Sequence, residues 1–420
     1  MSDLLPCVFN LGLSEKTLKI CIVYSRNPFP MMRGDQLTVA HLLSFLSSRG
    51  HIVDLVTLDL GGQVKPVQER WLAENCRNVH RIGHNYRDVL VGLARGLRKL
   101  LPLQVSLFHS AKQDFLVKTL DSKDKYDVIY AYYLRSAEVT KSYDGRNLLA
   151  LQLSQTLNTK RISANTRSFF KKIIYAVEAF LVERYEGKIW RSFRQVALIG
   201  EKDVESIEAA SAAHCDEKIS NWFYSAHGTD ISKFKPALQN EVVKGRIVFS
   251  GSMMYEPNVQ AVLWFVKNCW PEIKKAFENA QFYIVGRDPT FEIIQLGNKQ
   301  GIEVTGTVDD PSRYIRSADV CINPIQAAGG MQNKLIEYMA SEKIVVCTSI
   351  ANEAIKAPID AVVLADSAEL FTSSINRILR DPKLFAPVAR KAKEYVEDFW
   401  TWDHHFLKLE KNLIKMSKHS

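Results

Sequence analysis

The amino-acid sequence predicts an α/β protein built from two doubly wound parallel-sheet domains. Continuous apolar runs, such as residues 18–25, are typical of parallel strands buried on both faces. These runs alternate with stretches that repeat apolar residues at helical spacing, and the alternation restarts near residue 245. At 420 residues the chain is also too long for one hydrophobic core and fits two domains of about 200 residues each.

The first half opens with a β-loop-α-β unit. Residues 18–25 form the predicted first strand, which ends in the Pro/Gly-rich loop 26–36. Residues 37–50 follow as a helix with Gly50 at its C-cap, and residues 51–60 form the second strand. This order implies a parallel sheet with a right-handed crossover.

Later segments extend this first domain. Residues 126–133 and 147–153 are strand candidates, residues 169–193 read as a long helix, and residues 195–203 read as a strand running into a loop. The segment 221–236 mixes aromatic, Gly and Pro residues and is expected to end the domain.

The second half repeats the βα pattern. Its expected elements are a strand and turn at 245–253, a helix at 258–277, a strand at 280–289, a strand-turn-helix-strand unit at 303–325, and a helix and strand at 333–349. We therefore expect an N-terminal domain over 1–236, a C-terminal domain over 237–395, and a final helix over 396–420 that packs back toward the N-terminal domain. Ligands are expected in the cleft at the carboxyl ends of the strands.

Composition and charge narrow the class of protein. No apolar run reaches the roughly 18 residues of a spanning helix, and the N-terminus lacks the basic flank and cleavage site of a signal peptide. The seven scattered cysteines favour reduced, buried thiols and a cytoplasmic location. The net charge of +9 suits nucleic acid, an anionic membrane face or a phosphorylated substrate. No nucleic-acid module is legible, so we expect no nucleic-acid partner.

Four segments of the second half carry a family resemblance. They are residues 247–266, 282–289, 304–325 and 329–340. By their order and spacing the chain resembles the retaining family 4 glycosyltransferases of the GT-B fold, especially the bacterial surface-polysaccharide branch. The first half of the sequence resembles this family more loosely. The resemblance implies two Rossmann-like domains facing across a cleft, an N-terminal domain that binds the acceptor and a C-terminal domain that binds a nucleotide-sugar donor.

The strongest site candidate is the start of the helix near residue 333. Gly329 and Gly330 precede Met331, Gln332 and Asn333, and free backbone N–H groups at a helix N-terminus form an anion cradle. We predict that these five residues bind the donor diphosphate.

Two charged residues follow on this helix. Lys334 lies on the first turn and can add positive charge beside the departing phosphate, so it is a catalytic candidate. Glu337 lies one turn further, and the resemblance gives it the hydrogen bonds to the nucleotide ribose. The alternative is an ordinary helix start with a solvated Lys and Glu.

Two features depart from the family pattern. The resembled family commonly places a glutamate that faces the donor sugar eight positions before the ribose-binding one, and this chain has Gly329 there, so the identity of the sugar stays open. The family also places Arg and Lys after the first strand of this domain, where residues 251–258 hold no cation. Here Gly251 and Ser252 are expected to donate backbone N–H groups to the phosphates, and Asn258 to cap the following helix.

Three further features complete the predicted donor site. Arg287 is the second catalytic cation, with a surface salt bridge as its alternative. Gly306, Thr307 and Val308 are expected to meet the nucleobase through their backbone, which leaves a UDP or a GDP type of donor open. The pair Asp309–Asp310 precedes a proline at a helix start, so capping is favoured over metal binding. We predict no metal and no cofactor, with the nucleotide sugar as substrate.

The acceptor side is less distinct. Gly34 and Asp35 follow the first strand and are predicted to line the cleft, although Asp35 could instead cap the following helix. Tyr133 and Arg135 end another strand and are placed there too. No general base stands out, which suits a retaining mechanism driven by electrostatics and by alignment of the two substrates. His227 is a weaker site candidate than these four.

Residues 87–109 combine a basic amphipathic helix with an apolar sequel. One interpretation is a core-packed helix with an exposed basic face. The other is docking to the inner membrane face, where a lipid-linked acceptor would lie.

Together these features predict a cytoplasmic or membrane-peripheral enzyme. It would move a sugar from a nucleoside diphosphate to a glycan or lipid-linked acceptor, with retention, in cell-surface polysaccharide synthesis. The alternative that stays open is a non-catalytic, nucleotide-binding GT-B scaffold subunit. An epimerase on this fold would need acid/base residues at the cleft, and this sequence has none well placed there. A phosphorylase on this fold would usually be a much longer chain.

Overall fold

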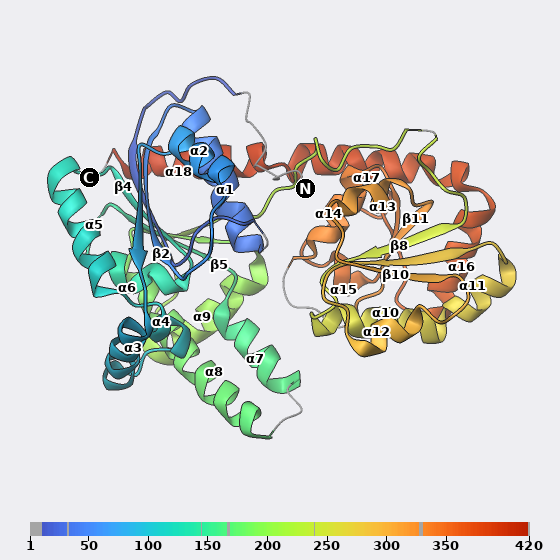
Figure 1. Ribbon diagram of the computed structural model, residues 1–420, viewed down its shortest axis with the longest axis horizontal. Helices are drawn as coiled ribbons and strands as arrows, with labels where there is room; N and C mark the ends of the chain where they lie inside the picture. The colour runs from blue at the N-terminus through green and yellow to red at the C-terminus, as the bar shows by residue number, and fades with distance from the viewer. Residues whose placement is uncertain are drawn as a thin grey trace. The chain divides into compact units, whose positions relative to one another are not determined.

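The computed structural model describes residues 11–31, 33–143, 145–165, 169–238, 240–326 and 331–418. The chain divides into two compact units, here called the first domain (residues 2–227 and 405–420) and the second domain (residues 228–404). Each is an α/β layer structure around a parallel sheet (Figure 1). The predicted fold class of two parallel-sheet α/β domains is therefore confirmed.

In the described part of the first domain, seven parallel strands form one sheet in the order β3-β2-β1-β4-β5-β6-β7. The strands are β1 (Lys19–Tyr24), β2 (Ile52–Asp59), β3 (Asn78–Gly83), β4 (Val128–Tyr132), β5 (Asn147–Gln152), β6 (Gln195–Leu198) and β7 (Trp222–Tyr224). The order reverses between β1 and β4, where Ile22 lies opposite Leu55 on one side and Tyr130 on the other. Loops at such a switch point are a usual place for ligands.

Helices cover this sheet and extend beyond it. They are α1 (Gly34–Ser48), α2 (Pro66–Asn75), α3 (Tyr86–Lys99), α4 (Leu103–Leu107), α5 (Ala111–Asp124), α6 (Ala137–Thr140), α7 (Gln155–Asn165), α8 (Phe169–Ile189) and α9 (Glu201–Cys215), with the short 3-10 segments η1 (Leu134–Ser136) and η2 (Trp190–Ser192). Helix α1 is buried at every position from Thr38 to Leu46, so it is covered on all its faces and not along one apolar stripe. Helices α7 and α8 lie side by side as a pair (Figure 1).

The described part of the second domain holds a six-stranded parallel sheet in the order β10-β9-β8-β11-β12-β13. Its strands are β8 (Arg246–Ser250), β9 (Gln281–Val285), β10 (Ile302–Gly306), β11 (Val320–Asn323), β12 (Ile344–Cys347) and β13 (Val363–Leu364). Its helices are α10 (Glu256–Asn268), α11 (Trp270–Ala276), α12 (Phe291–Leu296), α13 (Pro311–Arg316), α14 (Asn333–Ala340), α15 (Ser349–Asn352), α16 (Ala368–Arg380) and α17 (Ala386–Phe399), with η3 (Pro382–Phe385).

Strand β8 explains why this second sheet is covered on both faces. Ile247 and Phe249 belong to one buried cluster, whereas Val248 between them belongs to another. Successive side chains of a strand point to opposite faces, so helices must bury both. All three side chains are fully buried, which stabilises the domain by about 1.5–3 kcal/mol for each.

The last helix, α18 (Trp402–Met416), is shared between the two units, since residues from 405 onward belong to the first domain. The Phe406 ring lies 5.3 Å from the Phe45 ring of α1. The Glu410 carboxylate accepts a hydrogen bond from Arg49 at 2.9 Å and lies 2.8 Å from His51 Nε2. The Nδ1 atom of the His51 ring accepts the Leu18 N–H at 3.1 Å, so His51 is a structural residue.

Two further findings concern the described residues only. None of their helices is long and apolar enough to cross a membrane. Their six cysteines are free thiols, of which five are buried and Cys215 is half-buried.

Candidate functional site

The carboxyl end of β8 is tied to helix α14 by a buried tyrosine. The Tyr338 hydroxyl accepts the Ser250 N–H at 2.6 Å and lies 3.0 Å from the Ser250 hydroxyl. Tyr338 is fully buried, so this contact fixes α14 relative to the strand end. The residues that follow β8 and those on the first turn of α14 are thereby brought together.

Lys334 lies at the centre of this junction. Its Nζ donates to Asn258 Oδ1 at 2.5 Å and lies 4.5 Å from the centroid of the Phe249 ring. Gly251 packs against the same group, because an added Cβ would lie 3.3 Å from Lys334 Cε and 2.7 Å from Asn258 Nδ2. The lysine is thus held by one amide and one aromatic face, and no described carboxylate forms an ion pair with it.

Asn258 has a different role from the predicted one. Helix α10 begins at Glu256 with Tyr255 at its N-cap, so the expected helix cap by Asn258 is wrong. Its Nδ2 instead donates to the Ser252 carbonyl at 2.9 Å, while its Oδ1 accepts from Lys334. Asn258 is buried and positions Lys334, a contact that local sequence rules do not indicate.

The electrostatics of the junction depart from those of free side chains. Burial lowers the pKa of Lys334 to about 7, and the nearby Glu337 carboxylate only partly opposes this shift. Burial raises the pKa of Glu337 above its usual value, with Lys233 and Lys334 acting in the opposite direction. Neither oxygen of Glu337 accepts a hydrogen bond from any residue that the structure describes. A half-buried carboxylate in this state is suited to accept hydrogen bonds from a ligand.

The backbone donors after β8 are only partly available. The Gly251 N–H donates to the Val285 carbonyl at 2.9 Å, so the expectation that Gly251 offers its N–H to a phosphate is wrong. The Ser252 N–H has no acceptor within the described part of the chain. The turn after β9 lies directly against the turn after β8, because a Cβ on Gly286 would fall 1.7 Å from the Gly251 oxygen. Glycine is therefore required at Gly286.

The other predicted donor-side residues lie along the same edge of the sheet. Arg287 follows β9, and its Nε lies 3.9 Å from the Asp288 carboxylate, with both side chains exposed, so the expected surface ion pair exists. Gly306 ends β10 with φ of 65°, a left-handed conformation that favours glycine. Thr307 is exposed and Val308 half-buried. The parallel strands thus bring the turns after β8, β9 and β10 to one edge.

The residues before α14 are described only in part. Met331 is half-buried against the core, Gln332 is buried, and Asn333 is the first residue of the helix and exposed. The predicted cradle residues Gly329 and Gly330 lie outside the described residues.

Metal binding at Asp309–Asp310 receives no support from the local geometry. Asp310 Oδ1 accepts the Ser312 N–H at 3.0 Å at the start of α13, so the predicted helix cap is confirmed for this residue. Among the residues with described positions, no group of three or more His, Cys, Asp or Glu side chains could hold a metal ion.

At the carboxyl edge of the first sheet, Asp35 lies in a charged cluster. Gly34 begins α1, and the N-cap residue is Arg33, so the alternative that Asp35 caps this helix is wrong. The Asp35 carboxylate accepts from the Tyr24 hydroxyl at 2.9 Å and lies 3.5 Å from Arg26 Nε. Arg26 was not predicted as a site residue, and the only sequence signal for it was its place directly after the first strand.

Arg135 adds a second guanidinium to the same domain edge. It lies 4.6 Å from the Phe108 ring and 5.2 Å from the Tyr133 ring. Burial lowers the pKa of Arg135, and the charge of Arg26 adds to that effect. The Arg135 Nε is buried and has no hydrogen-bond partner among the residues that the structure describes, while the Tyr133 hydroxyl accepts from Gln155 at 2.8 Å. Both predicted residues therefore lie at this edge, and the Arg135 guanidinium has a buried donor without an acceptor among the described residues.

His227 has a structural contact. Its Nδ1 lies 2.7 Å from the Thr38 hydroxyl, and burial lowers the pKa of the imidazole to about 4. The ring is therefore neutral near pH 7.

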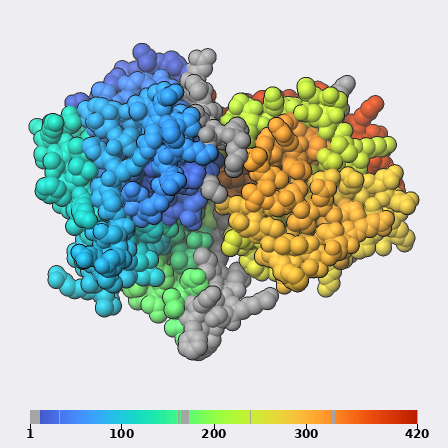
Figure 2. All heavy atoms as spheres, viewed as in Figure 1, coloured from blue at the N-terminus to red at the C-terminus, as the bar shows by residue number. Residues whose placement is uncertain are grey.

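Within the amphipathic segment 87–109, helix α3 buries no apolar side chain fully, whereas Val105 in the apolar sequel is fully buried in the core. Of the residues in α3, only Gly92 and Gly96 are buried, and both pack against Ser106 so closely that a Cβ would fall about 2 Å from it. Leu90, Val91 and Leu97 are exposed by 60%, 64% and 80%. The interpretation of α3 as a core-packed helix is therefore wrong, since the helix is held by its glycines, and Leu90 and Leu97 are left at the surface. Figure 2 shows the molecular surface on one side, with this segment in blue.

With this geometry in place, comparisons with known proteins define the class. Residues 244–381 match the family model described as "Glycosyl transferases group 1". A Klebsiella pneumoniae protein described as an "Uncharacterized 44.6 kDa protein in cps region" is 22% identical over 396 residues, which cover 90% of this chain and 96% of that protein.

Solved structures extend the likeness to nearly the whole chain. Sucrose-phosphate synthase from Thermosynechococcus elongatus gives a TM-score of 0.65 at 16% identity, covering 96% of this chain and all of that one. Anabaena HepE in complex with UDP and glucose gives 0.60 at 14% identity, covering 95% of this chain and 100% of that one. WaaG, a glycosyltransferase involved in lipopolysaccharide biosynthesis, gives 0.60 at 13% identity, covering 93% and 98%.

These matches define a class. The chain has the two-domain GT-B fold of glycosyltransferases, and its second domain is similar to the group 1 glycosyl transferases. This combination supports a transferase.

Proposed function

We propose that this protein is a retaining glycosyltransferase that moves a sugar from a nucleoside diphosphate sugar to a glycan or lipid-linked acceptor in cell-surface polysaccharide synthesis. The observation that carries the proposal is the junction of β8 and α14. There the half-buried Lys334 and Glu337 lie one helical turn apart, and among the described residues Lys334 has no ion-pair partner and Glu337 accepts no hydrogen bond. Both groups lack partners that a nucleoside diphosphate would supply.

The donor binds with its diphosphate toward Lys334 and its ribose toward Glu337. The ammonium group is held by Asn258 beside the turn after β8, where the absence of a side chain at Gly251 leaves room for it. A phosphate at this place gains a charge-assisted hydrogen bond from Lys334 and a second hydrogen bond from the Ser252 N–H. The N-terminal end of α14 also favours its negative charge. The ribose hydroxyls donate to Glu337. Thr307 and Val308 lie after β10, where their backbone can meet the base.

The donor is of the UDP or GDP type. HepE has been solved with UDP and with UDP-glucose, and it shares this fold. That likeness makes UDP the first nucleotide to test. The protein needs no metal in this proposal, because Lys334 and Arg287 supply the positive charge that neutralises the leaving diphosphate.

The acceptor binds at the carboxyl edge of the first sheet, with Gly34, Asp35, Tyr133 and Arg135 as its contacts. In the reaction, the bond between the sugar C1 and the diphosphate oxygen breaks while the acceptor oxygen bonds to C1 on the same face. The departing phosphate oxygen takes the acceptor's proton. No protein base is needed for this step, which suits the neutral but structurally engaged His227.

The proposed enzyme acts in the cytoplasm, at the inner face of a membrane. Exposed Leu90, Val91 and Leu97 on α3, with arginines on the same helix, form a surface that favours contact with an anionic bilayer. The related protein from the Klebsiella cps region supports a role in surface polysaccharide assembly.

A ligand panel tests the proposal. Thermal-shift measurements with UDP, GDP and ADP are followed by hydrolysis assays of the matching nucleotide sugars. We expect one diphosphate to raise the melting temperature and its sugar derivative to be turned over slowly without acceptor. Binding without turnover on any sugar or acceptor would instead support the non-catalytic scaffold, and an absence of any diphosphate binding would refute both.

A further inference from the structure

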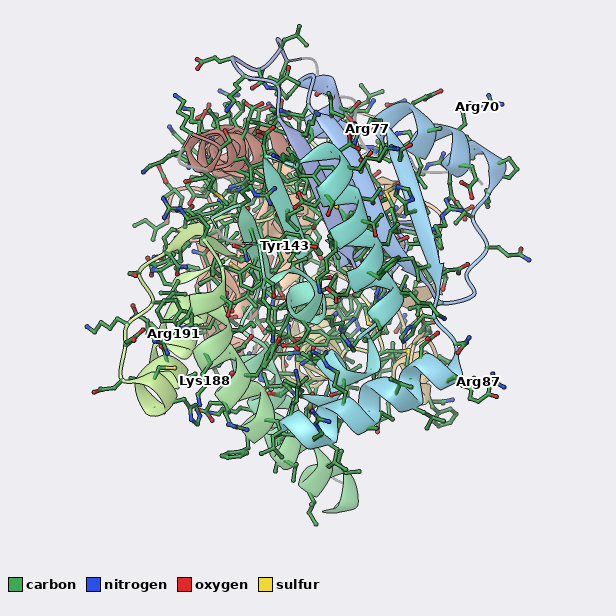
Figure 3. All side chains as sticks on the ribbon, turned by 90° about the vertical axis from the view of Figure 1, so that its left-hand side faces the viewer. Arg70, Arg77, Arg87, Tyr143, Lys188 and Arg191 are labelled. Atoms are coloured by element: carbon green, nitrogen blue, oxygen red, sulfur yellow. The ribbon has the colours of Figure 1, made fainter. Side chains whose placement is uncertain are left out.

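A basic pocket in the first domain lies outside the predicted donor and acceptor sites and shares Lys99, Leu100 and Leu101 with the segment 87–109. It has a volume of about 410 Å³ and lies between the end of α3, helix α6 and the last turns of α8. It is lined by Lys99, Leu100, Leu101, Glu138, Lys141, Arg184, Tyr185, Lys188, Ile189 and Ser192. Four cations and one carboxylate leave a surplus of three positive charges. Figure 3 looks onto this side of the domain, with Lys188 and Arg191 toward one edge and Arg87 toward the other.

The negative charge of the single carboxylate in the pocket is already balanced by neighbouring cations. Glu138, whose side chain is 1% exposed, accepts hydrogen bonds from Lys141 at 2.8 Å, Arg95 at 2.9 Å and the Tyr185 hydroxyl at 3.0 Å. Burial would raise its pKa, but these contacts outweigh burial and lower the pKa of Glu138. The carboxylate is therefore ionised and has no capacity left to balance the other cations.

Three cations in the pocket have no such partner. In the portion of the chain with described positions, Lys99, Arg184 and Lys188 form no ion pair. Their place at helix ends accounts for two of them, since Lys99 and Lys188 lie in the last turns of α3 and α8 and favour the negative ends of those helices. It does not account for Arg184, which is half-buried and lies more than one turn before the end of α8.

We infer that this pocket binds a phosphate group. The guanidinium of Arg184 offers a planar pair of N–H donors, and the ammonium groups of Lys99 and Lys188 add mobile point charges, the combination that recognises phosphate oxygens. The hydroxyl of Ser192, which also lines the pocket, is a neutral hydrogen-bond donor. A volume of about 410 Å³ accommodates a phosphate with a small polyol or sugar attached.

This phosphate could come from a soluble phosphate ester or from a lipid headgroup. The surroundings of the pocket make the lipid source testable. Leu97 and Leu100 on the α3 side are exposed by 80% and 54%, and Val177 and Phe180 on α8 by 55% and 60%. Apolar side chains that flank a cationic pocket suit a headgroup at a bilayer surface. The site does not depend on the proposed glycosyl transfer.

Hydrogen–deuterium exchange on the full chain tests the inference. The two probes are glycerol 3-phosphate, and phosphatidylcholine vesicles with and without phosphatidylglycerol. We expect the segments 134–141 and 184–192 to gain protection with at least one probe. A variant with both Arg184→Gln and Lys188→Gln should bind that probe about tenfold more weakly or worse. Segment 331–340 reports the nucleotide site separately, so failure of the proposed function leaves this test intact.

A control variant removes the same charge from elsewhere in the first domain. Lys123→Gln with Lys218→Gln changes two exposed lysines outside the pocket and should bind the probe like the wild type. Protection with glycerol 3-phosphate alone assigns a soluble ligand, and protection only with phosphatidylglycerol assigns a lipid headgroup. If the double pocket variant melts early, Lys188→Gln alone replaces it, because Lys188 is exposed. No protection with either probe, or equal losses in pocket and control variants, overturns the inference.

Discussion

The two sheet edges hold their positive charge in different ways. In the second domain, Lys334 is held by Asn258, and burial lowers its pKa to about 7. In the first domain, Arg26 and Arg135 are guanidiniums, which keep their charge at any physiological pH, and of the two only Arg26 has an ion-pair partner within the described part of the chain. A lysine of this kind can take up a proton when a diphosphate arrives. Binding of the proposed donor at the edge of the second sheet should therefore depend on pH. Binding of the proposed acceptor at the edge of the first sheet should not.

The largest effect is expected for Lys334→Met. Losing the ammonium group of Lys334 should lower turnover by about 10²–10³-fold, the range seen when one donor to a developing anion is removed. Stability should rise or stay unchanged, because a methionine of similar length buries no charge. Steady-state kinetics and thermal melts check both effects. Unchanged turnover, or a large drop in melting temperature, would count against a role on the phosphates.

The next effect should come from Arg135→Gln. This change removes a guanidinium whose Nε has no partner in the described structure, so transfer to acceptor should fall by about tenfold or more. Nucleotide affinity should stay the same, since the change lies in the first domain. Transfer assays and nucleotide titration on one preparation separate the two edges. Loss of nucleotide affinity would contradict this division of roles.

A comparable effect is expected for Glu337→Ala. Removing the hydrogen-bond acceptor of the ribose should weaken nucleoside diphosphate binding by about tenfold, while the fold stays intact because no described residue bonds to this carboxylate. Isothermal titration and circular dichroism measure the two properties. The exposed Glu292→Ala in the same domain serves as the control. Equal affinity in all three proteins would remove the ribose role.

The smallest effect should be that of Tyr338→Phe. The change removes the hydroxyl that accepts the Ser250 N–H at 2.6 Å and leaves that buried group unpaired. We expect a loss of about 1–3 kcal/mol in the free energy of unfolding, read from denaturant curves. The nucleotide affinity should fall only slightly. If Tyr338→Phe lowered nucleotide affinity more than Lys334→Met, the Tyr338 hydroxyl would contribute more to binding than Lys334.

Local patterns predicted much of the fold and one pair of residues of the candidate site. The strands were legible because buried parallel strands are continuous apolar runs, as in Lys19–Tyr24 and Arg246–Ser250. Lys334 and Glu337 were legible together because they share one short helix. The glycines Gly329 and Gly330 stay a prediction.

The contacts that complete the site could not be predicted from local sequence. Lys334 and Asn258 are 76 positions apart, and Tyr338 and Ser250 are 88 apart, so neither pair leaves a local pattern. The predicted cap by Asn258 failed because a tertiary contact offered its side chain other partners than the helix start. The cap alternative for Asp35 failed for the same reason, since Tyr24 and Arg26 lie on the neighbouring strand and loop.

The most direct test of the central claim is a calorimetric titration of UDP at pH 8 in buffers of different ionisation enthalpy. With a pKa of about 7, free Lys334 is mostly neutral at pH 8, and a bound diphosphate raises that pKa again. Binding should therefore take up close to one proton, and affinity should fall by up to about tenfold per pH unit above 7. Lys334→Met should show no uptake and no such slope. Tight binding by the wild-type protein without proton uptake would contradict the assignment of Lys334 to the donor phosphates.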